Sequence, residues 1–153
     1  MIKYCIKKWD KNNQVLLKEL TNRFKDLDDY EYKDFVKLTV EYILNYNSKN
    51  IEYNTENITE IDDGDYQGTL LYMIPEKTYQ PCEYEYLMTF VDYGSCSGCD
   101  TLQSIQCGYY EDTNEKIKAY FQLCKDLIVN MIKPYNTGWR ASEEFEHTEK
   151  NNI

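Results

Sequence analysis

The chain has 153 residues, of which 42% are hydrophobic and 29% are charged, and its formal net charge is −10. These values are typical of one soluble globular domain, and no apolar run approaches the about 20 residues that a membrane-spanning helix needs. The excess of carboxylates excludes nucleic-acid binding by phosphate neutralisation and adhesion to anionic membranes. It favours docking on a basic surface, with mere solubility as the alternative interpretation.

The start of the chain is basic but has no apolar stretch behind it, so we expect no signal peptide and a cytosolic protein. Thiols stay reduced in the cytosol. We therefore expect mostly free thiols at the six cysteines, which are Cys5, Cys82, Cys96, Cys99, Cys107 and Cys124. The 16 tyrosines suit a protein interface, because tyrosine offers a large contact area with few torsions to freeze.

Two helices are predicted in the first third of the chain. The first spans about residues 13–27, where leucine recurs at helical spacing. The second begins near Asp29, with Asp28 and Glu31 as its capping box, and a run of asparagines at residues 45–50 ends it. The short link between them predicts an antiparallel helical hairpin.

Three strands are predicted next, at residues 58–61, 66–74 and 84–93, because these runs are rich in tyrosine and β-branched residues. Asp63 and Gly64 between the first two are typical of a hairpin, and Pro75 stops the second strand. The short links indicate an antiparallel meander.

Two more helices are predicted after the strands. A short one begins at Asp100, with Gln103 as its capping partner, and a longer one begins at Asp112 and closes at Pro134. Residues 1–135 should therefore form one α+β domain, in which an N-terminal helical hairpin and two C-terminal helices pack on one face of a three-stranded antiparallel sheet. Residues 136–153 are predicted to be an acidic, flexible tail. Trp9 and Trp139 are expected to pack at the edges of the fold.

One segment concentrates residues that could form a site: Tyr93, Gly94, Ser95, Cys96, Ser97, Gly98, Cys99 and Asp100. It lies between a predicted strand and a predicted helix, whose positive N-terminal potential lowers a thiol pKa. The two cysteines have the spacing of a redox disulfide or of half a zinc site. The alternatives are a structural turn, a recognition loop, and an anion site formed by backbone N–H groups at residues 98–100.

The zinc and thioredoxin-like interpretations meet obstacles in the rest of the chain. Cys82 and Cys107 are irregularly spaced relative to the pair, and the single histidine, His147, lies in the predicted tail. A thioredoxin-like fold would also need strands after the CxxC helix, and the sequence predicts none.

A second candidate site contains Asp62, Asp63, Asp65 and Tyr66. Its oxygen atoms could bind Mg²⁺ or Ca²⁺, but the spacing is not that of an EF-hand loop. A hairpin turn whose aspartates bond their own backbone is the favoured interpretation.

The sequence offers no nucleophile–base pair, phosphate loop or dinucleotide fingerprint, so no catalytic residue is predicted and a non-enzymatic protein is favoured.

The segments DDGDYQGT (residues 62–69) and YGSCSGCDTLQ (residues 93–103) resemble a family of small uncharacterised proteins of phages and prophages from low-GC Gram-positive bacteria. The resemblance covers about residues 1–135, including residues 9–12 and residues 131–134. It implies a phage context but no mechanism. Cys82 stands where the family would have a small polar residue, which argues against Cys82 as a metal ligand.

In this context we expect a phage-encoded accessory protein that acts in the host cytoplasm without a cofactor. Our first hypothesis is that it binds and inhibits a host antiviral protein, such as a CRISPR-type effector with a basic surface, while binding neither nucleic acid nor membrane itself. The alternatives are a thiol-redox or zinc-binding protein that uses Cys96 and Cys99, and a protein that binds a small anionic ligand such as a nucleotide.

Overall fold

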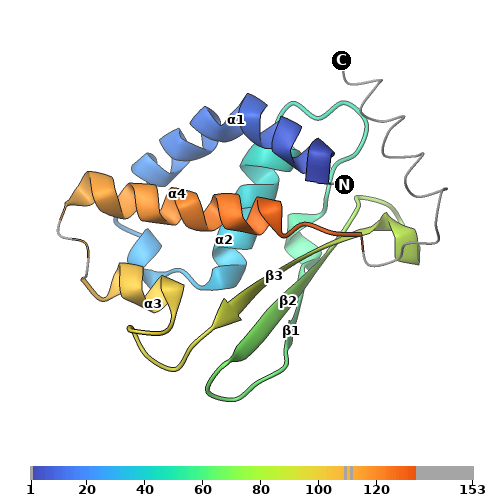
Figure 1. Cartoon of the computed structure of the whole chain (residues 1–153). Helices are drawn as coiled ribbons and strands as arrows, with labels where there is room; N and C mark the ends of the chain where they lie inside the picture. Colours follow the sequence, from blue (N-terminus) through green and yellow to red (C-terminus); the bar gives the residue numbers. More distant parts are fainter. Residues whose placement is uncertain (1, 109, 111, 134–153) are drawn as a thin grey trace.

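The computed structural model describes residues 2–108, 110 and 112–133, and it shows the α+β fold that the sequence predicts (Figure 1). The elements follow the predicted order: α1 (Ile2–Asn22), α2 (Tyr32–Thr39), β1 (Thr59–Asp62), β2 (Gly68–Pro75), β3 (Tyr86–Tyr93), α3 (Thr101–Gln106) and α4 (Thr113–Val129). A π-helix (Val40–Leu44) continues α2. No helix of the described part is long and apolar enough to cross a membrane. Trp139, His147, Pro134 and the predicted tail lie outside the described residues.

The start of α1 was predicted wrongly, because the helix begins at Ile2 rather than near Asn13. Polar side chains on its buried face, Lys8 and Asn12, interrupt the apolar pattern. The Asn12 amide is nevertheless satisfied, since it donates to the carbonyl oxygen of Ile43 at 2.7 Å. Because the partner of Asn12 lies in another element, the sequence around Asn12 gives no sign that this polar residue is buried.

The predicted capping box of the second helix was also wrong. Glu31 is the N-cap residue of α2, and its capping-box partner is Asp34. The Asp28 carboxylate instead accepts hydrogen bonds from the Lys116 ammonium at 2.7 Å and the Tyr120 hydroxyl at 2.6 Å. Asp28 therefore binds two side chains of α4 instead of capping α2.

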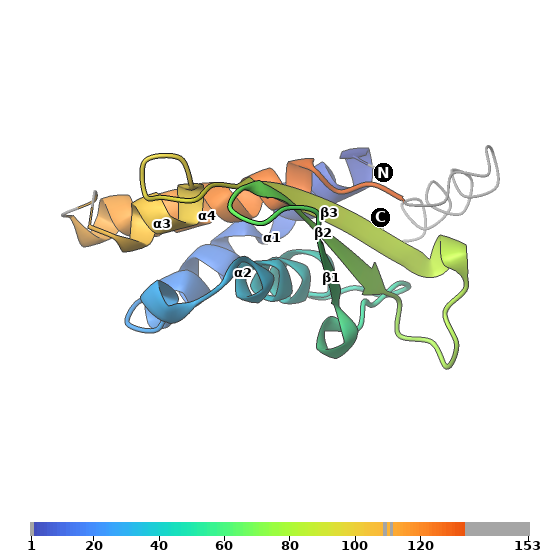
Figure 2. The same ribbon diagram turned by 90° about the horizontal axis from the view of Figure 1, so that it is seen from below.

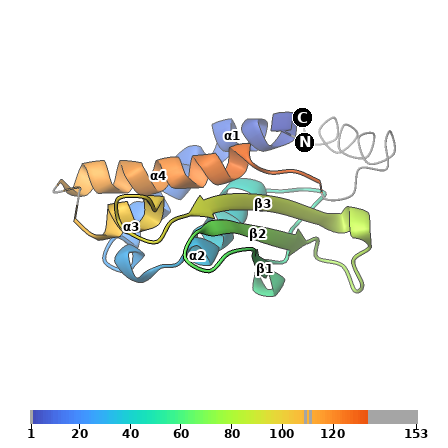
Figure 3. The ribbon, with the colours of Figure 1, turned by 60° about the horizontal axis from the view of Figure 1, so that its bottom comes forward.

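The three strands form an antiparallel sheet in the order β1-β2-β3 (Figure 3). Because side chains alternate along a strand, one face points towards α1, α2 and α4, and it carries buried Tyr72, Ile74, Leu87 and Thr89. Figures 2 and 3 show these helices on one side of the sheet. No described helix covers the other face, whose central side chains are Ile61, Leu71, Met73, Met88 and Phe90.

The chain after α4 runs along the outer edge of β3. α4 ends at Val129, earlier than the predicted end at Pro134. Met88 and Ile132 then exchange two backbone hydrogen bonds of 2.8 Å. The β3 edge is partly paired as a result, whereas β1 is an edge strand whose four residues are all exposed.

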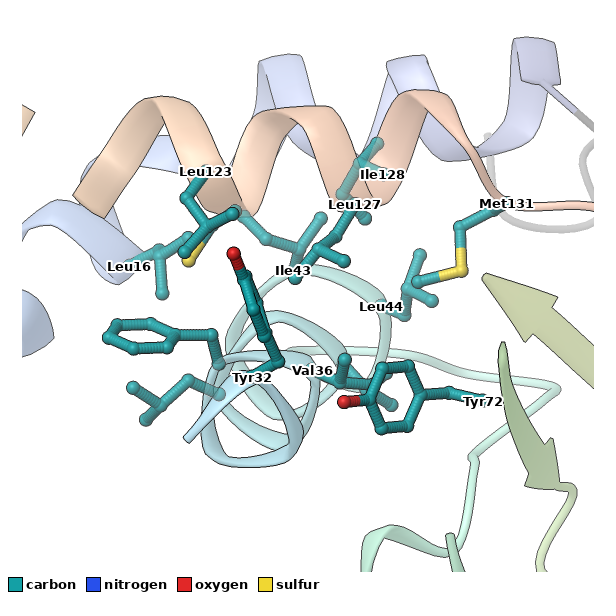
Figure 4. Close-up of a cluster of buried hydrophobic side chains, with 14 of the residues drawn as sticks. Leu16, Tyr32, Val36, Ile43, Leu44, Tyr72, Leu123, Leu127, Ile128 and Met131 are labelled. Atoms are coloured by element: carbon teal, nitrogen blue, oxygen red, sulfur yellow. The ribbon is translucent and has the colours of Figure 1, made fainter. Parts of the chain in front are cut away.

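The core lies between the helices and the sheet (Figure 4). The helices contribute Leu16, Val36, Ile43, Leu127 and Ile128 among others, and β2 contributes Tyr72. The prediction of edge packing for Trp9 was wrong: only 5% of this residue is exposed, and its ring lies 4.8 Å from that of Phe121 between α1 and α4.

Candidate functional site

The two segments that the sequence singled out meet at one end of the sheet. Gly68 pairs with Tyr93 in the β2–β3 register, so the loop before β2 lies against the end of β3. The Tyr93 hydroxyl donates a 2.6 Å hydrogen bond to Asp62 Oδ1. Thr69 Oγ1 likewise donates to Asp92 Oδ1 at 2.7 Å. The aspartate-rich loop and the cysteine-containing corner are therefore parts of one region.

The aspartate-rich loop adopts the predicted turn. The Gly64 N–H donates to Asp62 Oδ1 at 3.0 Å, and the Thr69 N–H donates to Asp63 Oδ1 at 2.6 Å. A Cβ on Gly64 would lie 2.0 Å from the Gln67 carbonyl oxygen, so this tight loop requires glycine there. The bonds from the Tyr93 hydroxyl and the Gly64 amide hold the pKa of Asp62 below its ordinary value.

The other two members of this candidate site, Asp65 and Tyr66, remain on the surface. Both are exposed, and Tyr66 is 83% exposed. Within the described part of the chain, no group of three or more histidine, cysteine, aspartate or glutamate side chains is arranged to hold a metal ion. The loop is therefore built by hydrogen bonds between its aspartates and the backbone, as the turn interpretation expects.

Asp100 holds the strand-to-helix corner together. This residue is only 4% exposed, and its carboxylate accepts hydrogen bonds from the Gly94 N–H at 2.9 Å, the Gln103 N–H at 2.9 Å and the Tyr32 hydroxyl at 3.0 Å. The Leu102 N–H donates to the Tyr32 oxygen at 3.0 Å. Asp100 therefore caps α3, as the sequence predicts, and two backbone donors at the helix start already have partners within the chain.

The two corner thiols are free, exposed and close together. Cys96 Sγ and Cys99 Sγ lie 2.9 Å apart, and the Cys96 N–H donates to Cys99 Sγ at 3.2 Å. The hydrogen bonds from the thiol and the amide of Cys96 lower the pKa of Cys99. A Cβ on Gly94 would lie 2.7 Å from Cys99 Sγ, so glycine is needed for the thiol to approach this backbone. Ser97 and Gly98 complete the turn between the two cysteines.

The remaining cysteines lie in different environments. Cys82 and Cys107 are exposed elsewhere on the surface, and the neighbouring Glu85 carboxylate raises the pKa of Cys82. Cys5 and Cys124 are buried, and burial raises the pKa of each thiol to about 12. Only the pair at the corner combines exposure with a neighbouring thiol among these six.

A cleft of about 340 Å³ lies beside the corner, between the end of the sheet, the start of α2, and α3. Four of its lining residues are acidic: Glu31, Glu60, Asp62 and Asp100. Four more are tyrosines: Tyr30, Tyr32, Tyr72 and Tyr93. No lysine, arginine or histidine lines it.

Most of this cleft could not be recognised in the sequence. Of its lining residues, Asp62, Tyr93, Gly94 and Asp100 were predicted as site residues, but Glu31, Tyr32 and Glu60 were not. Glu31 was assigned only as a helix cap, and Glu60 was assigned only to a strand. These residues become neighbours only when α2 packs beside the sheet.

Tyr72 lies at the inner side of the cleft with its hydroxyl buried. None of the described residues forms a hydrogen bond with this hydroxyl. Burial raises the pKa of Tyr72, and the interaction of its hydroxyl with the nearby Glu60 carboxylate raises it further.

No protein-family model, curated protein or solved structure matches this chain. The resemblance to phage proteins remains a prediction. The function is therefore inferred from the geometry of the cleft and the corner.

Proposed function

We propose that this chain is a non-enzymatic phage accessory protein that binds and inhibits a host protein, and that its cleft receives a lysine or arginine side chain of that partner. The observation that carries the proposal is the lining of the cleft, which combines four carboxylates and four tyrosines with no basic side chain. Such a cavity favours a positive charge both electrostatically and through the faces of the aromatic rings.

The cleft carboxylates have no cation of their own in the described structure. The ion pairs found there use acidic residues outside the cleft, namely Glu19, Asp28, Glu52 and Glu56. Glu31, Glu60 and Asp62 are exposed at the mouth of the cleft. A guanidinium group has donors enough to bond two of these carboxylates at once.

The uncovered sheet face offers the apolar area that a stable complex also needs. A specific interface buries about 800 Å² on each partner, which is more than one side chain in a cleft provides. Ile61 is 46% exposed at the β1 edge, and Leu71, Met73, Met88 and Phe90 are partly exposed beside it. Tyrosine, phenylalanine and methionine are the residues that interface centres favour. Because Glu60 and Ile61 point to opposite faces of β1, we infer a partner that reaches around the β1 edge, with a basic side chain in the cleft and apolar side chains on the uncovered face.

The net charge of −10 adds a long-range attraction to such a partner. Complementary charge raises association rates and orients the encounter. A host effector that binds nucleic acid has a basic channel of the required sign. Occupying that channel would inhibit the effector without any chemical step, which fits the phage context implied by the resemblance.

A matched pair of charge reversals tests the proposal. Glu60→Lys places a cation in the cleft, whereas Glu83→Lys changes the net charge equally at an exposed position outside it. Each variant and the wild type would be immobilised and exposed to the same lysate of a low-GC Gram-positive host, with quantitative mass spectrometry of the bound proteins.

We expect at least one host protein to bind the wild type and Glu83→Lys but not Glu60→Lys, and to be released by high salt, which screens charge. The purified partner should lose at least about tenfold in affinity for Glu60→Lys, because like charges in contact cost several kcal/mol. The proposal is refuted if no bound protein distinguishes the two variants.

A further inference from the structure

The Cys96–Cys99 pair is arranged for reversible oxidation. The two sulfur atoms lie 2.9 Å apart, and a disulfide bond requires about 2.05 Å. Closing the bond therefore demands a movement of less than about 1 Å. Both side chains are exposed, so a reagent in solution can reach them.

The corner holds this pair in place through its backbone. The N–H groups of Cys99 and Asp100 both donate to the Cys96 carbonyl oxygen, at 3.1 and 2.9 Å. The Gly94 N–H donates to the Asp100 carboxylate at 2.9 Å, which ties the two ends of the segment together. The thiols are thus brought together before any reagent arrives, which lowers the entropic cost of joining them.

The two sulfurs are not equivalent. Cys99 Sγ receives the Cys96 N–H at 3.2 Å and lies 2.9 Å from the Cys96 thiol and 3.9 Å from Ser95 Oγ. Donors around a sulfur stabilise its thiolate, and these contacts lower the pKa of Cys99. Cys99 is therefore the better source of the nucleophilic thiolate.

We propose that Cys96 and Cys99 form a thiol–disulfide exchange site for small disulfides of the glutathione disulfide class, with Cys99 as the attacking thiol and Cys96 as the resolving thiol. This activity goes beyond partner binding and does not depend on it. The Cys99 thiolate attacks one sulfur of the disulfide, forms a mixed disulfide and releases the first thiolate, which takes up a proton.

The Cys96 thiol then loses its proton to water and attacks Cys99 Sγ. The Cys96–Cys99 bond forms, the bond from Cys99 to the small thiol breaks, and the second thiolate leaves and is protonated. One disulfide is reduced to two thiols while the protein dithiol is oxidised, so the electrons balance. The reverse sequence reduces the corner when the small thiol is in excess.

The test separates the two roles by single substitutions in a Cys82→Ser/Cys107→Ser background, which removes the other exposed thiols. The proteins are reduced, freed of reductant and mixed with glutathione disulfide at pH 7, and their intact masses are followed in time. Circular dichroism confirms that each variant is folded. The expected product of the background protein is an internal disulfide, with only a transient glutathione adduct.

Cys96→Ser should accumulate the glutathione adduct on Cys99, because no resolving thiol remains. Cys99→Ser should form its adduct at least about fivefold more slowly than the background protein reacts, since it lacks the stabilised thiolate. Faster adduct formation in Cys99→Ser than in Cys96→Ser would reverse the assigned roles. The reference rate is that of the exposed Cys82 and Cys107 in a Cys96→Ser/Cys99→Ser variant. If the background protein reacts with glutathione disulfide no faster than this reference, the proposed site is refuted.

Two glycine variants test the proposal without changing either cysteine. A Cβ on Gly94 would lie 2.6 Å from the Cys99 carbonyl oxygen, whereas a Cβ on Gly98 has only Cys96 Sγ within 4 Å, at 3.8 Å. We expect Gly98→Ala to retain rapid internal disulfide formation and Gly94→Ala to lose at least about half of its rate, because rapid closure depends on the placement of the two thiols. Equal rates in both variants would show that the corner geometry is irrelevant to the exchange.

Discussion

Replacing Asp100 by alanine should destabilise the fold far more than removing an ordinary helix cap. The Asp100 side chain is buried and accepts three hydrogen bonds, from Gly94, Gln103 and Tyr32. Asp112 provides the matched control, because it caps α4 through one hydrogen bond to the Asn114 N–H at 3.0 Å and is exposed.

The magnitude follows from what each substitution leaves behind. Loss of a helix N-cap costs about 1 kcal/mol, which is all that Asp112→Ala should lose. Asp100→Ala also leaves the Gly94 N–H and the Tyr32 hydroxyl without their acceptor in a buried place. Each orphaned donor costs about 1–3 kcal/mol, so we expect about 3–7 kcal/mol in total with the lost cap. Asp100→Asn keeps one acceptor oxygen and should lose about 1–2 kcal/mol.

Urea unfolding followed by far-UV circular dichroism measures these differences in the free energy of unfolding. The slope of that free energy with urea should be the same for the wild type and all three variants, which would show that the same surface is exposed on unfolding. If Asp100→Ala and Asp112→Ala lose the same free energy within about 0.5 kcal/mol, the hydrogen bonds at the corner do not stabilise the fold and the reasoning fails.

Three further outcomes are expected. Gly94→Ala should lose about 1–3 kcal/mol of stability in urea unfolding because its Cβ would clash with the Cys99 backbone, whereas Gly98→Ala should change little; equal losses would contradict the close approach. Burial raises the pKa of Asp28, but the hydrogen bonds that it accepts outweigh burial and hold its pKa below the ordinary value. A lowered carboxylate pKa stabilises the fold above the unfolded pKa of about 3.9 and ceases to do so as pH falls through the folded pKa. Tyr120→Phe should therefore lose about 1 kcal/mol at pH 7, and a pH series of unfolding curves should show the loss shrinking as the pH falls below the unfolded pKa of about 3.9; an undiminished loss would exclude the Asp28 bond as its source. After reduction, a thiol reagent should modify four cysteines rapidly in the folded protein and two more only on unfolding, and any other division would contradict the burial of Cys5 and Cys124.

The sequence alone was sufficient where the signal is local. The three strands, the turn at Asp63 and Gly64 and the N-caps at Asp100 and Asp112 all depend on residues within a few positions of each other. Alternation and capping chemistry are properties of a short stretch of chain, so they can be recognised before any packing is known.

The tertiary structure decided whatever depends on partners far along the chain. Asn12 can be buried in α1 because the carbonyl oxygen of Ile43 in the π-helix accepts its hydrogen bond. Asp28 does not cap a helix, because its carboxylate binds Lys116 and Tyr120 of α4 instead. The cleft exists only because α2 brings Glu31 beside Glu60 of β1 and the corner at Asp100. The CxxC spacing was visible in the sequence, but the reason to choose Cys99 as the nucleophile was not. It comes from how the corner folds, because the Cys96 N–H donates to Cys99 Sγ and Ser95 Oγ lies 3.9 Å from the same sulfur.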